Sequence, residues 1–103
     1  METKNVIEAI QTICNEIVKN DSEMLKWRFG VTQEDLSHIA QISHSIVLHK
    51  HGLRSGGGFV QAVCKDSLSE AASRADSTMQ KVLGYMSTFS DRAEAIYHEA
   101  NKN

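Results

Sequence analysis

Residues 32–52 read TQEDLSHIAQISHSIVLHKHG, and they contain the start, the apolar face and the end of one helix. Thr32 is a favourable N-cap, Asp35 occupies the third helical position, and His51 with Gly52 ends the pattern. Between these ends, apolar residues recur at steps of three or four, which is the period of a helix that buries one face. They are Leu36, Ile39, Ile42, Ile46 and Val47, with the small Ser43 among them.

The chain before this stretch follows the same helical period. Apolar residues at steps of three and four predict a helix over about residues 3–19. A polar break at residues 20–22 precedes a short helical segment over 24–29, and Gly30 is expected to end that segment as a C-cap.

The chain after this stretch is also helical in pattern. Phe59 opens a further helix, and Ser67 with Glu70 predicts a capping box for the next one. From residue 68 to residue 100 the apolar positions keep steps of three and four, with a break expected near residues 88–91. Because the chain has no proline and no alternating strand pattern, residues 1–103 are expected to form one all-α domain without a sheet. Its expected architecture is an irregular bundle of five or six helices.

Composition and charge limit the possible functions. The formal net charge of −2 argues against sequence-independent DNA binding, which requires a strongly cationic surface. Cys14 and Cys64 fall at apolar helical positions, so both are expected to be buried free thiols. The N-terminus lacks the features of a signal peptide, and no apolar run reaches the length of a membrane span. A cytoplasmic protein without membrane contact is expected, and its thin core favours a homo-oligomer.

A loop of distinctive composition, LRSGGG at residues 53–58, is the main candidate for a ligand site. Three successive glycines leave the backbone amides accessible, and a helix N-terminus directly after them attracts anions. Nearby cations, above all Arg54, suit a phosphate group. The expected ligand-binding residues are Lys50, His51, Arg54, Ser55, Gly56, Gly57, Gly58, Phe59 and Arg74. The same composition also suits a plain connector between helices, or a loop that becomes ordered when it binds a protein.

The large aromatic residues and the histidines have two interpretations. Trp27 and Phe29 suit either the core or an exposed anchor at an interface, where tryptophan is enriched. His38 and His49 share one edge of their helix and suit a solvated or interface face. No histidine pair has the four-residue spacing of a helical metal site, so neither a metal nor a cofactor is expected. Paired carboxylates and activated nucleophiles are not recognisable, and we expect no enzymatic activity.

The run HGLRSGGGFVQAVCKDSLSEAASRADSTMQKVLGYMSTF, residues 51–89, resembles a family of small helical proteins encoded in bacteriophage genomes. The matching positions are His51, Gly52, Gly58, Phe59, Ala62, Val63, Leu68, Arg74, Ala75 and Asp76. Prolines of the family's turn are replaced here, and the resemblance covers less than half of the chain. It implies a phage or prophage origin and a role that acts on the host.

Three functional hypotheses follow. The first is a non-enzymatic phage protein that counters host defence by sequestering a phosphate-bearing nucleotide signal at the glycine loop, with Trp27 or Phe59 stacking on a base. The second is an inhibitor that binds a protein of a host defence complex, in the manner of an anti-CRISPR protein. The third is a structural or regulatory helical dimer.

Overall fold

A computed structural model describes residues 3–102, and within them every regular element is an α-helix. The all-α prediction is therefore confirmed. The described residues contain eight helices, more than the five or six expected. They are α1 (Thr3–Asn20), α2 (Ser22–Phe29), α3 (Gln33–Lys50), α4 (Gly58–Cys64), α5 (Leu68–Arg74), α6 (Ser77–Lys81), α7 (Leu83–Asp91) and α8 (Ala93–Ala100).

The additional helices arise in the last third of the chain, where the sequence pattern predicted one or two long helices. The backbone becomes extended at Ala75 and Asp76, and the Asp76 carboxylate accepts a hydrogen bond of 2.8 Å from the backbone N–H of Met79. This side-chain cap starts α6 as a separate helix. A second break falls at Val82 and a third at Arg92, directly after the expected interval 88–91. The apolar period continues across all three breaks, so periodicity alone did not reveal the first two.

The predicted caps have mixed outcomes. Thr32 and Asp35 form a reciprocal capping box at the start of α3, as predicted. Gly30 ends α2 in the left-handed conformation, with φ of 67°, and this prediction is also confirmed. The predicted box at α5 is wrong: Ser67 precedes the helix but makes no side-chain cap bond. The Glu70 carboxylate instead pairs with the Lys65 ammonium at 3.8 Å.

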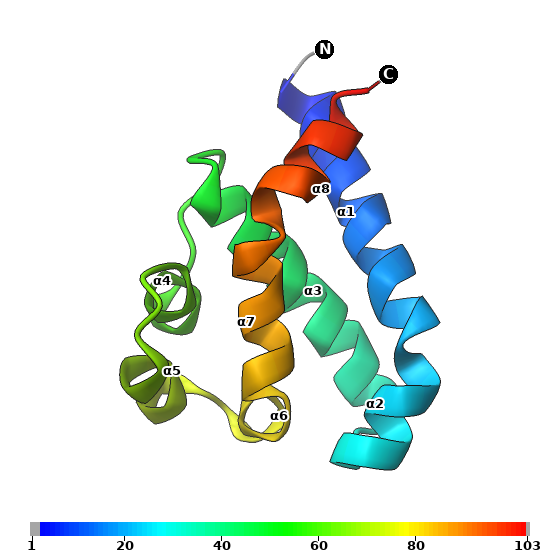
Figure 1. Cartoon of the computed structure of the whole chain (residues 1–103), viewed down its shortest axis with the longest axis vertical. Coiled ribbons are helices and arrows are strands. Elements are labelled where there is room, and N and C mark those ends of the chain that lie inside the picture. Colours follow the sequence, from blue (N-terminus) through cyan, green and yellow to red (C-terminus); the bar gives the residue numbers. More distant parts are fainter. Residues whose placement is uncertain (1–2, 103) are drawn as a thin grey trace.

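Helix α3 lies at the centre of the fold (Figure 1). It packs against α1 along one side and against α4, α6, α7 and α8 along others. Helices α4 and α5 pair with each other, and α8 lies across the N-terminal half of α1. Helix α2 follows the far end of α1, so it lies at the opposite end of the molecule from the start of α1 and the end of α8 (Figure 1).

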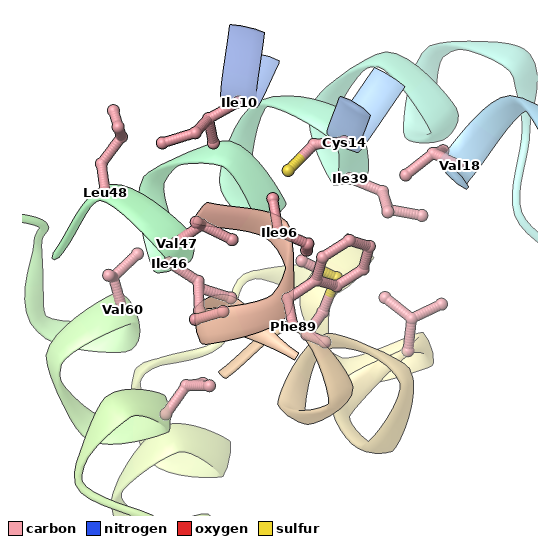
Figure 2. Close-up of a cluster of buried hydrophobic side chains, with 14 of the residues drawn as sticks. Ile10, Cys14, Val18, Ile39, Ile46, Val47, Leu48, Val60, Phe89 and Ile96 are labelled. Atoms are coloured by element: carbon pink, nitrogen blue, oxygen red, sulfur yellow. The ribbon is translucent and has the colours of Figure 1, made fainter. Parts of the chain in front are cut away.

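The core forms where α1, α3, α7 and α8 meet. Figure 2 shows Phe89 and Ile96 facing apolar side chains of α3, with Ile10 and Cys14 projecting from α1. All of these side chains are buried, and removing such apolar surface from water is the main stabilising contribution to a domain of this size. Both thiols are free as predicted, although Cys64 is only half-buried.

Candidate functional sites

The glycine loop is held closely by its neighbours. The backbone N–H of Gly56 donates to Nδ1 of His49 at 3.0 Å, and the Gln61 side-chain amide donates to the Gly56 carbonyl at 2.9 Å. The loop leads into α4, as the sequence analysis expected. One of its three glycine amides is therefore occupied inside the protein, and His49 serves as its acceptor.

Of the expected cations Lys50, Arg54 and Arg74, Arg74 alone lies against the glycines of this loop. The Lys50 ammonium donates to the Cys64 carbonyl, 3.3 Å away, at the opposite end of α4. The Arg74 guanidinium lies against Gly58, so closely that a Cβ at this glycine would come within 2.8 Å of a guanidinium nitrogen. Arg54 instead borders a cavity between α1 and α3. The structure thus distributes the expected cations over three places.

Three more of the expected ligand residues have separate positions. The Nε2 atom of His51 lies 2.9 Å from the carbonyl oxygen of Ala93, and its ring stacks on Tyr97 at a centroid distance of 4.2 Å. These contacts attach the end of α3 to α8. Phe59 is partly buried and packs against the core, so its ring is not presented to a base. Ser55 is exposed.

The cavity beside Arg54 is the larger of the two main cavities along the seam between α1 and α3. Its volume is about 580 Å³, within the range of small-molecule sites. Helix α1 contributes Lys4, Ile7, Glu8 and Gln11, α3 contributes Gln41, His44 and Ser45, and Arg54 follows α3. Ile7 is the single apolar side chain of this set, and the other seven carry hydrogen-bonding or charged groups on aliphatic or aromatic stems. We call it the α1/α3 cleft.

His44 is the buried titratable group of the α1/α3 cleft. Its Nε2 atom lies 3.1 Å from the carbonyl oxygen of Ile7, and this contact joins α3 to α1. Burial, which disfavours the charged ring, lowers the pKa of His44, and the positive charge of Arg54 acts in the same direction. The hydrogen bond to Ile7 opposes both effects. At neutral pH the ring is therefore uncharged.

Of the four predicted interface residues, Trp27 alone is fully presented to solvent, with 89% of its surface exposed. Phe29 is half-buried and packs against the core. His38 pairs with Asp76, with 2.7 Å between Nε2 and the carboxylate oxygen, and His49 holds the glycine loop. The last two side chains therefore have partners inside the chain.

Helix α2 buries one large apolar residue and exposes two others. Leu25 is fully buried and anchors the helix, whereas Met24 and Trp27 lie three residues apart on an exposed side. Lys26 and Arg28, on either side of Trp27 in the sequence, are also exposed. A second cavity, of about 380 Å³, lies beside the first residue of α2 and includes Lys19 and Leu36 in its lining. We call the exposed side chains of residues 24–28 the α2 surface.

A polar group that the sequence analysis did not recognise joins α3 to α6. The Asp35 carboxylate accepts hydrogen bonds from the Thr32 N–H at 2.8 Å, the Thr78 hydroxyl at 2.7 Å and the Lys81 ammonium at 3.1 Å. These bonds, led by the one from Thr32, hold the pKa of Asp35 far below its usual value. Both carboxylate oxygens are occupied, by the cap of α3 and by two side chains of α6, so the group is structural.

The two thiols lie in surroundings that favour their protonated form. Burial raises the pKa of Cys14 to about 11 and also raises that of Cys64, so neither is a thiolate near neutral pH. Among residues 3–102, no three His, Cys, Asp or Glu side chains gather as a metal would require. The helices in this part of the chain include none that is long and apolar enough to cross a membrane.

Comparisons with protein-family models, curated protein sequences and solved structures found no match to this chain. The candidate sites are therefore judged on their geometry. The cleft residues Lys4, Glu8, Gln11 and Gln41 were not identified from the sequence. Each falls on the polar side of an amphipathic helix, where a ligand-binding residue has the same pattern as an ordinary solvated one.

Proposed function

We propose that this protein is a non-enzymatic binding protein of phage or prophage origin that inhibits a host defence complex through the α2 surface. The observation that carries the proposal is the exposure of Trp27, 89% of whose surface is in contact with solvent. Tryptophan is the residue most typical of binding hot spots, because its large flat ring removes much apolar area from water on association. Trp27 takes no part in attaching α2 to the core, since Leu25 is fully buried there and Phe29 packs against it.

The charge around Trp27 favours an acidic protein surface as the partner. Lys26 and Arg28 are exposed next to it in the sequence, and with the exposed Glu23, one turn before Trp27, they give α2 a formal charge of +1 in a chain whose formal net charge is −2. A local cationic surface on an otherwise weakly acidic protein directs association toward a surface of opposite sign. The cavity beside Ser22, at the start of the same helix, is lined in part by Lys19 and offers space for a partner side chain.

The nucleotide hypothesis has less support at the place where the sequence analysis located it. Lys50, Arg54 and Arg74 contact three different parts of the molecule, and Gly56 has its amide bonded to His49. For this reason we propose the protein-binding function first. The phage origin rests on the resemblance of residues 51–89.

The test begins with the immobilised protein and a lysate of the host bacterium, followed by identification of each retained protein. The purified partner is then titrated against wild type, Trp27→Ala and Leu68→Ala. Leu68 is the matched control, because it is also a large apolar residue, 56% exposed, but lies on α5. We expect Trp27→Ala to weaken binding by about thirtyfold and Leu68→Ala by less than about threefold. Binding should also weaken with added salt.

The biological arm measures phage plating on defended bacteria that express each variant. Wild type and Leu68→Ala should restore plating, and Trp27→Ala should not. Equal activity of Trp27→Ala in both arms would contradict the proposal. A dimer in light scattering that dissociates on Trp27→Ala would assign the α2 surface to self-association instead.

A further inference from the structure

The α1/α3 cleft combines a volume of ligand size with an excess of positive charge. Lys4 and Arg54 contribute two cations and Glu8 one carboxylate, while His44 is neutral near pH 7. The cleft therefore carries a formal charge of about +1 in a chain of net charge −2. A cavity with charge opposite to that of the molecule attracts anions in preference to cations.

The cations of the cleft are available to a ligand. Within residues 3–102, neither Lys4 nor Arg54 has a carboxylate oxygen within 4.0 Å of its charged nitrogen atoms. By contrast, Lys50 and Lys81 are bound to acceptors of the protein itself. A guanidinium offers paired N–H donors that match two phosphate oxygens, and a lysine ammonium adds a point charge.

The remaining lining groups suit the polar body of a small molecule. The amides of Gln11 and Gln41 each provide a donor and an acceptor, and Glu8 accepts hydrogen bonds from hydroxyl or amino groups. Because Ile7 is the single apolar lining side chain, a hydrophobic ligand would leave these polar groups without partners. The volume of about 580 Å³ accommodates a molecule of mononucleotide size.

We infer that the α1/α3 cleft binds a nucleoside monophosphate, with the phosphate at Arg54 and Lys4 and the nucleoside at Glu8, Gln11 and Gln41. This site lies along the N-terminal half of α1, whereas the α2 surface follows its C-terminal end (Figure 1). A helix of 18 residues is about 27 Å long, so the two sites are separate. The inference does not depend on the proposed function, and Trp27→Ala should leave it unaffected.

The test is calorimetric titration of the full chain with AMP, GMP, CMP and UMP, alongside adenosine and inorganic phosphate. At least one nucleotide should bind, adenosine should not, and inorganic phosphate should bind more weakly than the nucleotide. Arg54→Gln should weaken nucleotide binding by about tenfold or more. Arg74→Gln is the matched control, since it removes the same charge from the glycine-loop region, and it should change affinity by less than about twofold.

A second readout locates the site independently of affinity. Nucleotide binding should shift the backbone amide resonances of Gln11, Gln41 and Ser45 and leave those of α5 unchanged. Glu8→Gln should strengthen inorganic phosphate binding, because it removes a negative charge, and reduce the preference for the nucleotide over phosphate. The inference is overturned if none of the four nucleotides binds. It is also overturned if Arg74→Gln abolishes binding while Arg54→Gln does not, or if the shifts gather at residues 56–59.

Discussion

The structure leaves no space for a side chain at residue 56, so glycine is required there. The sequence, with its run of three glycines, does not show which of the three is required. A Cβ at Gly56 would lie 2.7 Å from the Cβ of Val60, which is buried in the core. A Cβ at Gly57 would meet no atom within 4 Å. The neighbouring glycines therefore differ in their role: Gly56 permits close packing, whereas Gly57 only precedes α4 as its N-cap residue.

We expect Gly56→Ala to lower the free energy of unfolding by about 1–3 kcal/mol, because Val60 or the loop must shift to relieve the overlap. Gly57→Ala is the control and should lower it by less than about 1 kcal/mol, since its φ of −73° suits any residue. Urea denaturation followed by circular dichroism measures both values. Equal destabilisation by the two substitutions would show that the close approach to Val60 is not what limits residue 56.

At the scale of the elements, Asp35 links two helices that the sequence pattern treats as unrelated. Its carboxylate caps α3 through Thr32 and also accepts bonds from Thr78 and Lys81, at the two ends of α6. Helix α6 has only five residues, too few to be stable alone. Its position therefore depends on Asp35 and on its own N-cap, Asp76.

Asp35→Ala should lower the melting temperature by about 5 °C or more, because it removes a helix cap together with two contacts between helices. Glu34→Ala is the matched control: it removes an exposed carboxylate from the same first turn of α3. We expect this control to change the melting temperature by less than about 2 °C. Thermal unfolding by calorimetry checks both, and a similar loss in the two variants would contradict the linking role.

At the scale of the whole molecule, stability depends on pH through titratable side chains whose pKa values are shifted by the fold. The sequence alone does not show which side chains these are. His44 has a pKa below its usual value because it is buried, so the unfolded chain takes up a proton at higher pH than the folded protein. Its contribution to stability is present above about pH 6.5 and declines as the pH falls. The lowered pKa values of Asp35 and Asp76 add a further decline below about pH 4.

His44→Gln should therefore reduce the fall in melting temperature between about pH 7.5 and pH 5.5, since glutamine has no charged form in this range. His98→Gln is the control, because His98 is exposed on α8 and should leave the pH dependence unchanged. Thermal unfolding across this range measures each slope. If His44→Gln keeps the wild-type slope, burial of His44 is not the cause of the pH dependence.

The helical state and several helix ends were predictable from the sequence, because they depend on residues close together in the chain. The bond from the Asp35 N–H to the Thr32 hydroxyl spans three positions, and the left-handed turn at Gly30 requires only its own residue type. The break at Asp76 depends on equally local contacts. It was missed because the apolar period continues past it. At the expected capping box, Ser67 makes no cap bond and Glu70 pairs with Lys65.

The candidate sites could not be predicted in the same way, because the packing of distant segments brings their residues together. Arg54 was expected to bind a ligand together with the glycines that follow it, but it borders a cleft whose other side is the first three turns of α1. Leu25 is buried and Trp27 is exposed, although both are large and apolar. Their residue types therefore did not decide that Trp27 lies at the surface. Local hydrogen bonds determine where a helix begins and ends. Which helix faces pack against each other depends on contacts between residues tens of positions apart, and no short sequence pattern contains that information.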